Sequence, residues 1–169
     1  MLRSNKFVSA LTAGAIFVSS ISISYPIFAS SADKDEIFIS SAEEMAEFSE
    51  NCRLDSWSKG KNVTLTADIN LTDIDFEPVP IFSGTFNGAG HTIKGLRLEK
   101  AGSNIGLFRY VGAGGMVEDL NVQAIITPGG SAGKAGGIIG TNSGTVRNCT
   151  FLGTVRGESE IGGIVGRNS

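Results

Sequence analysis

Residues 136–157 read GGIIGTNSGTVRNCTFLGTVRG, and residues 162–169 begin the same phrase again as GGIVGRNS. The second copy starts 26 residues after the first. A repeat at a fixed period of about 20 to 50 residues is typical of a solenoid, whose units are each too thin to bury a core alone. We therefore expect stacked coils, and the pattern predicts that the chain is truncated within a repeat.

Residues 1–29 have the features of a secretory signal peptide. Two basic residues precede an apolar run over residues 7–23, and small residues follow it. Cleavage is predicted after Ala29 or Ala32. An uncleaved membrane anchor is the alternative, but the run is diluted by Ser, Thr and Gly and is shorter than the roughly 20 residues of a spanning helix. The prediction is a secreted or cell-surface protein.

The charge of the remaining chain limits its partners. Removal of the signal takes away Arg3 and Lys6, so 12 basic residues remain against 17 acidic ones. A mildly acidic surface gives no electrostatic reason to bind nucleic acid or anionic lipid. No second apolar segment is long enough to span a bilayer, so no membrane span is expected after signal cleavage. The length suits one domain.

Two cysteines, Cys52 and Cys149, lie 97 residues apart. This spacing alone does not indicate a disulfide. Cys149 occupies an apolar position of the repeat and Cys52 lies at the end of an expected helix, where a thiol acts as a small hydrophobic group. We expect two unpaired, buried thiols.

Glycine divides the chain after the signal into two parts. Residues 33–83 contain one glycine, whereas residues 84–169 contain 21. The first part is expected to be an N-terminal capping region, and the second part a β-helix repeat region.

The capping region has signals for one helix and two strands. Residues 37–40 predict a short strand, and Ser41 or the serine before it, followed by two glutamates, predicts the N-cap of an amphipathic helix over residues 41–52. Apolar and polar residues alternate over residues 62–71. This alternation predicts a single half-buried strand.

The glycine-rich part alternates short apolar segments with glycines. Three six-residue segments, beginning at Ile93, Val117 and Val146, align with apolar residues at their first, fourth and sixth positions. Apolar pairs bracketed by glycine lie between these segments. The pattern predicts a right-handed parallel β-helix with two or more strands in each turn of about 24 to 29 residues. A flexible linker is excluded because apolar residues keep fixed positions, which a linker does not require.

The phrase at residues 136–149 resembles the GLUG-motif repeats of bacterial secreted and surface proteins. Two upstream phrases, LTADINL at residues 65–71 and FSGTFNGAGHTIKGL at residues 82–96, resemble the segment that often precedes such repeats. The resemblance covers most of residues 37–169. It implies an extracellular β-helix-like scaffold in a longer protein, either adhesin-like or the N-terminal region of a zinc peptidase that cleaves immunoglobulin A. It transfers no catalytic residue, since the zinc-binding His-Glu-x-x-His segment has no counterpart in a chain with one histidine.

Asp73, Asp75 and Glu77 are candidates for a calcium site. They alternate along the chain, so an extended backbone would place three carboxylates on one face. Paired acids could also act on glycosidic bonds. The favoured interpretation is a solvated strand face before a proline turn, and no catalytic residue or cofactor is assigned.

Three residues are candidates for ligand contact, namely Trp57, Asn121 and Asn148. Trp57 is the single tryptophan and would stack on a sugar ring if exposed, or would cover the open first coil. Asn121 and Asn148, together with Asp119, are expected at polar strand positions, where they form ladders between coils or contact sugars. His91 is the only histidine, and we expect a structural role because a zinc site needs three or four protein ligands.

These features favour a role in binding or display. The chain is expected to be the N-terminal part of a secreted or cell-surface protein that contacts a host protein, matrix or glycan. The alternative is a secreted enzyme, either a zinc peptidase whose catalytic domain is not in this sequence or a carbohydrate-active β-helix. If the 169 residues are the whole protein, the last coil, residues 161–165, exposes an unpaired strand edge. Such an edge predicts self-association.

Overall fold

The computed structural model describes residues 35–130 and 133–169, and the expected signal peptide at residues 1–29 lies outside them. The described part is mostly β with one short helix, and every strand pair is parallel. No helix in this part has the length and apolar character needed to cross a membrane.

The elements follow in the order β1 (Glu36–Ile39), α1 (Ala42–Asn51), β2 (Asn62–Leu65), β3 (Ile69–Asn70), β4 (Thr85–Asn87), β5 (Thr92–Leu98), β6 (Phe108–Val111), β7 (Met116–Glu118), β8 (Asn121–Ile126), β9 (Ala135–Gly136), β10 (Ile139–Asn142), β11 (Thr145–Arg147), β12 (Thr150–Val155), β13 (Ile161–Gly162) and β14 (Val165–Asn168).

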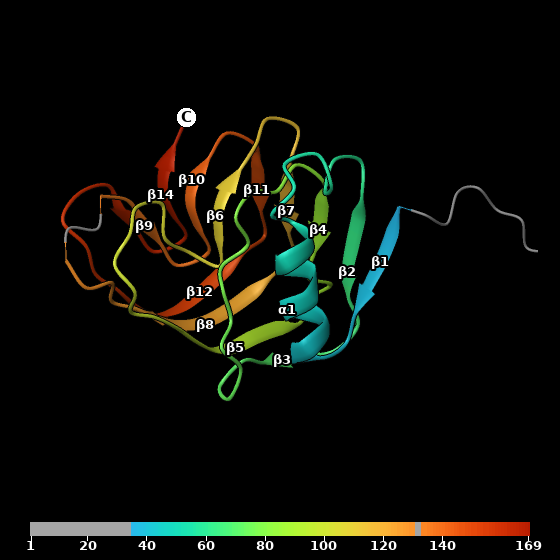
Figure 1. Cartoon of the computed structure of the whole chain (residues 1–169), viewed down its shortest axis with the longest axis horizontal. Coiled ribbons are helices and arrows are strands. Elements are labelled where there is room, and N and C mark those ends of the chain that lie inside the picture. Colours follow the sequence, from blue (N-terminus) through green and yellow to red (C-terminus); the bar gives the residue numbers. More distant parts are fainter. Residues whose placement is uncertain (1–34, 131–132) are drawn as a thin grey trace, which may run out of the picture. The chain divides into compact units, whose positions relative to one another are not determined.

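The strands stack into parallel sheets (Figure 1). The five-stranded sheet has the order β1-β2-β4-β7-β11, the four-stranded sheet β12-β8-β5-β3, the three-stranded sheet β14-β10-β6 and the two-stranded sheet β13-β9. The chain passes through the five-stranded sheet once in each coil, so its strands mark five successive coils. This architecture confirms the predicted parallel β-solenoid.

The register of the five-stranded sheet brings equivalent apolar residues together. Val63, Phe86, Val117 and Val146 are successive partners in this sheet. Their spacings of 23, 31 and 29 residues span a wider range than the repeat predicted. The connections therefore differ in length from coil to coil. The four side chains nevertheless stack on one another as one column inside the solenoid.

Helix α1 begins with a capping box at Ser41. The Ser41 hydroxyl accepts a hydrogen bond from the Glu44 backbone N–H at 3.2 Å, and the Glu44 carboxylate accepts one from the Ser41 backbone N–H at 3.2 Å. These reciprocal bonds satisfy two N–H groups that the helix leaves unpaired. A further hydrogen bond from the Ser40 backbone N–H is the main cause that lowers the pKa of Glu44. The helix predicted over residues 41–52 is confirmed.

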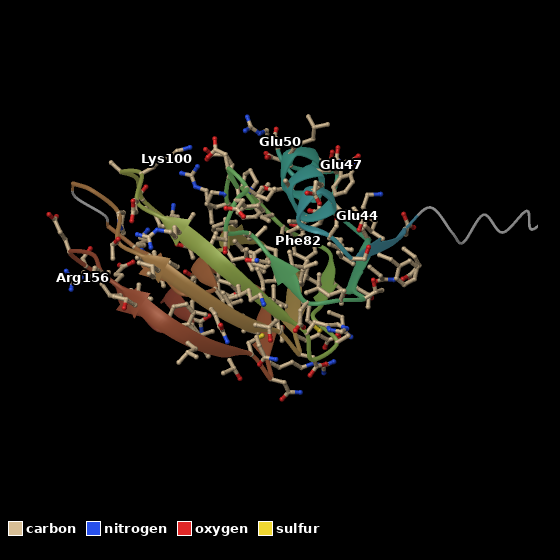
Figure 2. The ribbon with its side chains drawn as sticks, turned by 90° about the horizontal axis from the view of Figure 1, so that it is seen from below. Glu44, Glu47, Glu50, Phe82, Lys100 and Arg156 are labelled. Carbon is tan, nitrogen blue, oxygen red and sulfur yellow. The ribbon has the colours of Figure 1, made fainter. Side chains whose placement is uncertain are left out.

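Helix α1 covers the open end of the solenoid core. It packs against β3, and Met45, Phe48 and Cys52 are 0%, 2% and 0% exposed. Glu44, Glu47 and Glu50 of the helix are exposed and point outward in Figure 2, whereas Phe82 lies inside the molecule. The Phe48 ring lies 5.7 Å from the Phe82 ring, between ring centroids. The predicted capping role of the helix is therefore confirmed.

The single strand predicted over residues 62–71 is wrong, because the structure divides it into β2 and β3. These strands belong to different sheets, and a corner joins them. Val63, Leu65 and Ile69 are each 1% exposed, so the alternation continues across the corner. An inward side chain stays inward when the chain bends around the core, which is why the sequence pattern did not reveal the bend. Residues of the expected capping region thus also form part of the stacked coils.

The alignment of the three strand segments is correct for two of them. Val117 pairs with Val146, as predicted. Ile93 instead pairs with Val122 in the four-stranded sheet, and the partner of Val117 in the preceding coil is Phe86. The three segments share the same spacing of apolar residues for two different reasons. The segments that begin at Val117 and Val146 turn a corner between two sheets, whereas the segment that begins at Ile93 stays in β5, where a β-bulge shifts the register.

Glycine is required at residue 137, where the next coil approaches closely. A Cβ atom on Gly137 would lie 2.1 Å from the carbonyl oxygen of Gly163 and 2.3 Å from the Phe151 ring. Gly163 is the equivalent residue in the second copy of the motif, and no described heavy atom lies within 4 Å of its Cβ position. The requirement at Gly137 is therefore steric and arises from the next coil.

The last coil covers its apolar side chains less completely than the others. Val146 and Phe151 are only partly buried, whereas their partners Val117 and Val122 are 0% and 1% exposed. Ile161 is 41% exposed. Within the described residues, β11, β12, β13 and β14 each have a strand partner on one side only.

We expect Gly137→Ala to lower the free energy of unfolding by about 1–3 kcal/mol, because the added methyl group overpacks the contact between two coils. The matched variant Gly163→Ala should change it by less than about 0.5 kcal/mol. Chemical denaturation of both variants measures the difference. Equal losses would contradict the steric explanation.

Candidate functional site

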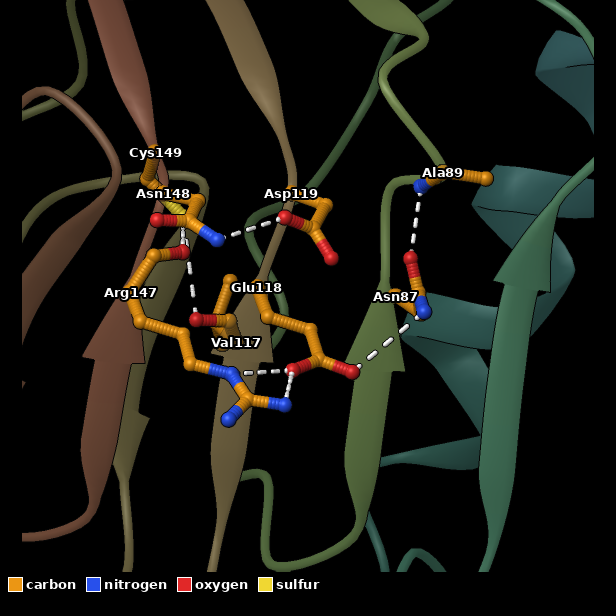
Figure 3. Close-up of polar contacts among 8 residues, drawn as sticks. All are labelled: Asn87, Ala89, Val117, Glu118, Asp119, Arg147, Asn148 and Cys149. Carbon is orange, nitrogen blue, oxygen red and sulfur yellow. Dashed lines mark hydrogen bonds and ion pairs between the residues drawn. The ribbon is translucent and has the colours of Figure 1, made fainter.

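Two of the residues considered for ligand contact lie at the corner between the five-stranded and four-stranded sheets. Asp119 and Asn148 are corner residues rather than strand residues, and each has a φ of 50°. Asn and Asp adopt this left-handed conformation more readily than most residues. The Asn148 Nδ2 atom donates a hydrogen bond to Asp119 Oδ1 at 3.0 Å (Figure 3). The pair forms a ladder between neighbouring coils, as one of the two sequence interpretations predicted.

A second polar ladder connects β4, β7 and β11. Asn87 Nδ2 donates to Glu118 Oε1 at 3.3 Å, and Arg147 Nε donates to Glu118 Oε2 at 2.5 Å (Figure 3). The Glu118 side chain is 9% exposed, whereas that of Arg147 is 59% exposed. The guanidinium therefore lies over a nearly buried carboxylate and neutralises it. Sequence reasoning missed this pair, although both residues occupy the second position of aligned segments.

Two further asparagines, Asn121 and Asn142, also bridge coils. Asn121 Nδ2 donates to the Gly90 carbonyl oxygen at 2.9 Å. Asn142 was not singled out from the sequence, yet it is 4% exposed and its Nδ2 donates to Asn168 Oδ1 at 2.7 Å. These last two residues are the asparagines of the two motif copies. The repeated asparagine could have indicated this contact from the sequence. Equivalent residues of stacked coils lie side by side, so the two side chains can form a hydrogen bond.

Trp57 belongs to the covered end of the solenoid. Its ring centroid lies 6.1 Å from that of Phe48, and the Lys61 ammonium lies 5.0 Å from the Trp57 ring centroid. The side chain is partly buried against the core. A ring held between Phe48 and a cation supports the capping interpretation over a sugar platform.

His91 has a structural position at the corner before β5. Its Nδ1 lies 3.3 Å from Asp68 Oδ1, which also accepts a hydrogen bond from the Thr92 backbone N–H at 2.9 Å. The Thr92 hydrogen bond, assisted by His91, lowers the pKa of Asp68. These contacts join two neighbouring coils.

Both cysteines are free thiols, but their surroundings differ. Cys52 is 0% exposed, and burial raises the pKa of its thiol to about 12. Cys149 is only partly buried, which corrects the expectation that both thiols are buried. Burial is also the main cause that raises the pKa of Cys149. A raised thiol pKa lowers the fraction of reactive thiolate.

The calcium candidates Asp73, Asp75 and Glu77 lie in a turn and loop after β3, rather than on the extended strand that a shared face requires. Lys100 Nζ lies 3.7 Å from Asp75 Oδ1 and forms an ion pair with Glu77. The hydrogen bond to Glu77 is the main cause that raises the pKa of Lys100. Among the residues that the structure describes, no three His, Cys, Asp or Glu side chains are grouped so that they could hold a metal ion.

A cleft of about 240 Å³ lies between this loop, residues 71–78, and the segment from the end of β5 to Ile105. Apolar, polar and charged side chains all line it. A concave site with a mixed lining can hold a small ligand. The sequence did not predict the cleft, because it arises where two coils are incompletely paired.

We expect Arg147→Gln to lower the free energy of unfolding by about 1–2 kcal/mol, because it leaves the Glu118 carboxylate without its cation. This loss is smaller than the roughly 3–5 kcal/mol that removal of one partner from a fully buried ion pair costs, since Arg147 is largely exposed. The double variant Glu118→Gln with Arg147→Gln should recover part of the loss. A double-mutant cycle by chemical denaturation gives the coupling energy, and strictly additive losses would contradict the pair's role.

We expect added calcium or a chelator to leave the melting temperature unchanged, because Asp75 and Glu77 already form ion pairs with Lys100 and the three acids do not share one strand face. Differential scanning fluorimetry measures the shift. A calcium-dependent rise in melting temperature that Asp75→Asn abolishes would contradict this expectation and support the calcium site.

Comparisons with known proteins identify one repeat. The model of the family described as the GLUG motif matches residues 131–156. Halomucin from Haloquadratum walsbyi is 38% identical over 123 residues, which cover 63% of this chain and 1% of halomucin. A putative Gly-rich membrane protein from Evansella cellulosilytica is 27% identical over an alignment of 216 residues, which covers 97% of this chain and 25% of that protein.

The chain thus spans far less than two thirds of the length of these two relatives. No solved structure matches it. The matched segment runs from the approach to β9, through the glycine phrase, to the end of β12. Residues 131–156 of this chain are therefore a GLUG-motif repeat, as their sequence predicted.

Proposed function

We propose that this chain is part of a surface-associated, extracellular repeat scaffold with an adhesin-like role, which binds a host protein, matrix or glycan. The observation that carries the proposal is the use of polar side chains within the stack. Asn121, Asn142 and Asn148 donate hydrogen bonds to neighbouring coils, and Glu118 is paired with Arg147. Side chains that hold one coil to the next build a rigid surface, which is what display requires.

The relatives and the N-terminal sequence support a location outside the cytoplasm. One relative is named halomucin and the other a putative Gly-rich membrane protein. Residues 1–29 have the charge and hydropathy pattern of a signal peptide. Attachment of the chain to a surface, contact with a host ligand, and self-association through residues 161–165 are parts of the proposal.

A non-catalytic role is favoured over an enzymatic one. Two of the three acids considered for glycosidic chemistry, Asp75 and Glu77, are paired with Lys100, and the histidine is paired with Asp68. The GLUG repeat itself supplies stacked strands and polar ladders. A catalytic domain elsewhere in a longer protein would be compatible with this scaffold.

Expression of the tagged full chain in a bacterial secretion host tests export. We expect the protein in the medium or on the cell surface, with a new N-terminus at Ser30 or Asp33, because the signal is removed after Ala29 or Ala32. N-terminal sequencing and mass spectrometry identify the cleaved bond. The matched control lacks residues 1–29 and should stay inside the cell. Full retention of the intact chain in the cytoplasm would contradict an extracellular role.

The secreted chain then tests the binding role against immobilised matrix proteins and a panel of glycans. Saturable retention without a change in the mass of the ligand is the expected result. Release of cleaved peptide or sugar products would instead support the enzymatic alternative. Absence of retention on every surface would contradict the adhesin-like role while leaving the export result intact.

A further inference from the structure

Three Asn-x-Thr sequences occur in the chain, and they begin at Asn62, Asn70 and Asn148. This motif is the acceptor sequence for N-linked glycosylation, in which an oligosaccharide is attached to the asparagine side chain. All three asparagines are exposed, so exposure does not distinguish them. Their hydrogen bonds and their places in the sheets differ.

The side-chain amides of Asn62 and Asn148 are already used in contacts between coils. Asn62 Nδ2 donates a hydrogen bond to Glu36 Oε1 at 2.7 Å, and Asn148 Nδ2 donates one to Asp119 Oδ1 at 3.0 Å. The sugar of an N-linked glycan is bonded to Nδ2, so modification at either position requires the amide to leave its carboxylate partner.

The backbone around these two asparagines is also held by neighbouring strands. The first motif, residues 62–64, lies in β2, and each of its residues pairs with both β1 and β4. In the third motif, Thr150 pairs with Asn121 of β8. A transferase that binds the backbone of either motif must first separate strands.

Asn70 is different because its amide nitrogen is free. Asn70 Oδ1 accepts hydrogen bonds from the Thr72 hydroxyl at 2.7 Å and from the Thr72 backbone N–H at 3.2 Å. Among the residues that the structure describes, none accepts a hydrogen bond from Asn70 Nδ2. The planar amide group is thus held through its oxygen, which leaves its nitrogen for reaction.

Asn70 also lies where the chain leaves its sheet. β3 is the outermost strand of the four-stranded sheet, beside β5 in Figure 1, and it ends at Asn70. The Leu71 backbone N–H donates to the Lys94 carbonyl oxygen at 2.8 Å, and an exposed turn begins at Thr72. Within the described residues, this motif therefore has a neighbouring strand on one side only, and it continues into the turn.

The neighbouring strand makes room for the contact between Asn70 and Thr72. Gly95 of β5 has a φ of +79°, and a Cβ atom there would lie 2.4 Å from Thr72 Oγ1 and 2.9 Å from Asn70 Oδ1. The register between β5 and β8 shifts at the same place, between Lys94 and Leu96. The glycine and the bulge leave the space that the two side chains occupy. The arrangement of this motif is therefore part of the fold.

We propose that Asn70 is an N-glycosylation site, whose Nδ2 accepts an oligosaccharide from a polyprenyl-diphosphate-linked donor through a transferase. The reaction forms a bond between Nδ2 and the anomeric carbon of the first sugar. It breaks the bond between that carbon and the phosphate oxygen of the donor. The polyprenyl diphosphate leaves with the electron pair of that bond, and the proton lost from Nδ2 passes to a base of the transferase. The proposal goes beyond the scaffold role, since it assigns a covalent modification to the surface.

Modification of the purified chain in its folded state tests the proposal. The enzyme is a single-subunit oligosaccharyltransferase that requires only Asn-x-Thr, supplied with its polyprenyl-diphosphate-linked oligosaccharide. Synthetic peptides over residues 58–66, 66–74 and 144–152 carry the same three motifs without the fold. Mass spectrometry of proteolytic fragments gives the rate at each asparagine, which is compared with the rate of its own peptide.

We expect Asn70 in the folded chain to react less than about tenfold more slowly than its peptide, because its motif lies at an exposed turn. Asn62 and Asn148 should react at least about tenfold more slowly than their peptides, since local opening must come first. The proposal fails if Asn70 is slowed as much as the other two asparagines. It also fails if none of the three is slowed, because the fold then does not select Asn70.

Asn70→Gln is the decisive variant, and the double variant Asn62→Gln with Asn148→Gln is its matched control. Thermal unfolding shows that each variant is folded. We expect Asn70→Gln to abolish modification of the folded chain and the double variant to retain it. Thr72→Ser keeps the hydroxyl and should retain modification, whereas Thr72→Val should lose it. Modification that persists in Asn70→Gln, or that disappears in the double variant, would overturn the proposal.

The protein isolated from the cells that produce it provides the last test. Trypsin releases residues 62–94 as one fragment, and fragmentation in the mass spectrometer distinguishes a glycan on Asn70 from one on Asn62. We expect an oligosaccharide on Asn70. An exported chain whose Asn70 is unmodified would contradict the proposal. Export is measured separately by N-terminal sequencing, so this failure is distinguishable from failure of the scaffold role.

Discussion

Each coil of this solenoid needs the coils on either side of it to bury its apolar side chains completely. The column formed by Val63, Phe86, Val117 and Val146 shows the constraint, since Val117 lies between two coils and is 0% exposed, whereas Val146 in the last coil is only partly buried. Helix α1 takes the place of a neighbouring coil at the first end by inserting Met45, Phe48 and Cys52. The cap and the glycine positions both follow from this need for close coil-to-coil contact.

The same stacking determines where binding chemistry is available. Polar side chains at the corners meet their equivalents in the next coil, so Asn148 bonds to Asp119 and Asn142 to Asn168. Donors used in this way are not free to recognise a ligand. The cleft beside β5 is different because pairing between two coils stops early there. A regular scaffold thus acquires a concave site where its regularity is interrupted.

Much of the fold could be predicted, and the errors have a common cause. Helix α1, its cap and the pairing of Val117 with Val146 depend on local sequence or on a close repeat. The corner between β2 and β3 was missed because residues on both sides of it face the same core. Ile93 was assigned to the wrong column because a bulge in β5 produced the apolar spacing that a corner produces elsewhere. Periodicity reports which side chains face inward, but not the direction of the backbone.

The sequence by itself determined the solenoid class, the capping helix and the GLUG repeat, because each of these depends on residue type at short or fixed spacing. Only the tertiary structure decided which strands share a sheet, that Arg147 covers Glu118, and that a cleft lies beside Arg109. These features join residues of different coils. Their geometry depends on the number of residues in each connection, and that number varies from coil to coil.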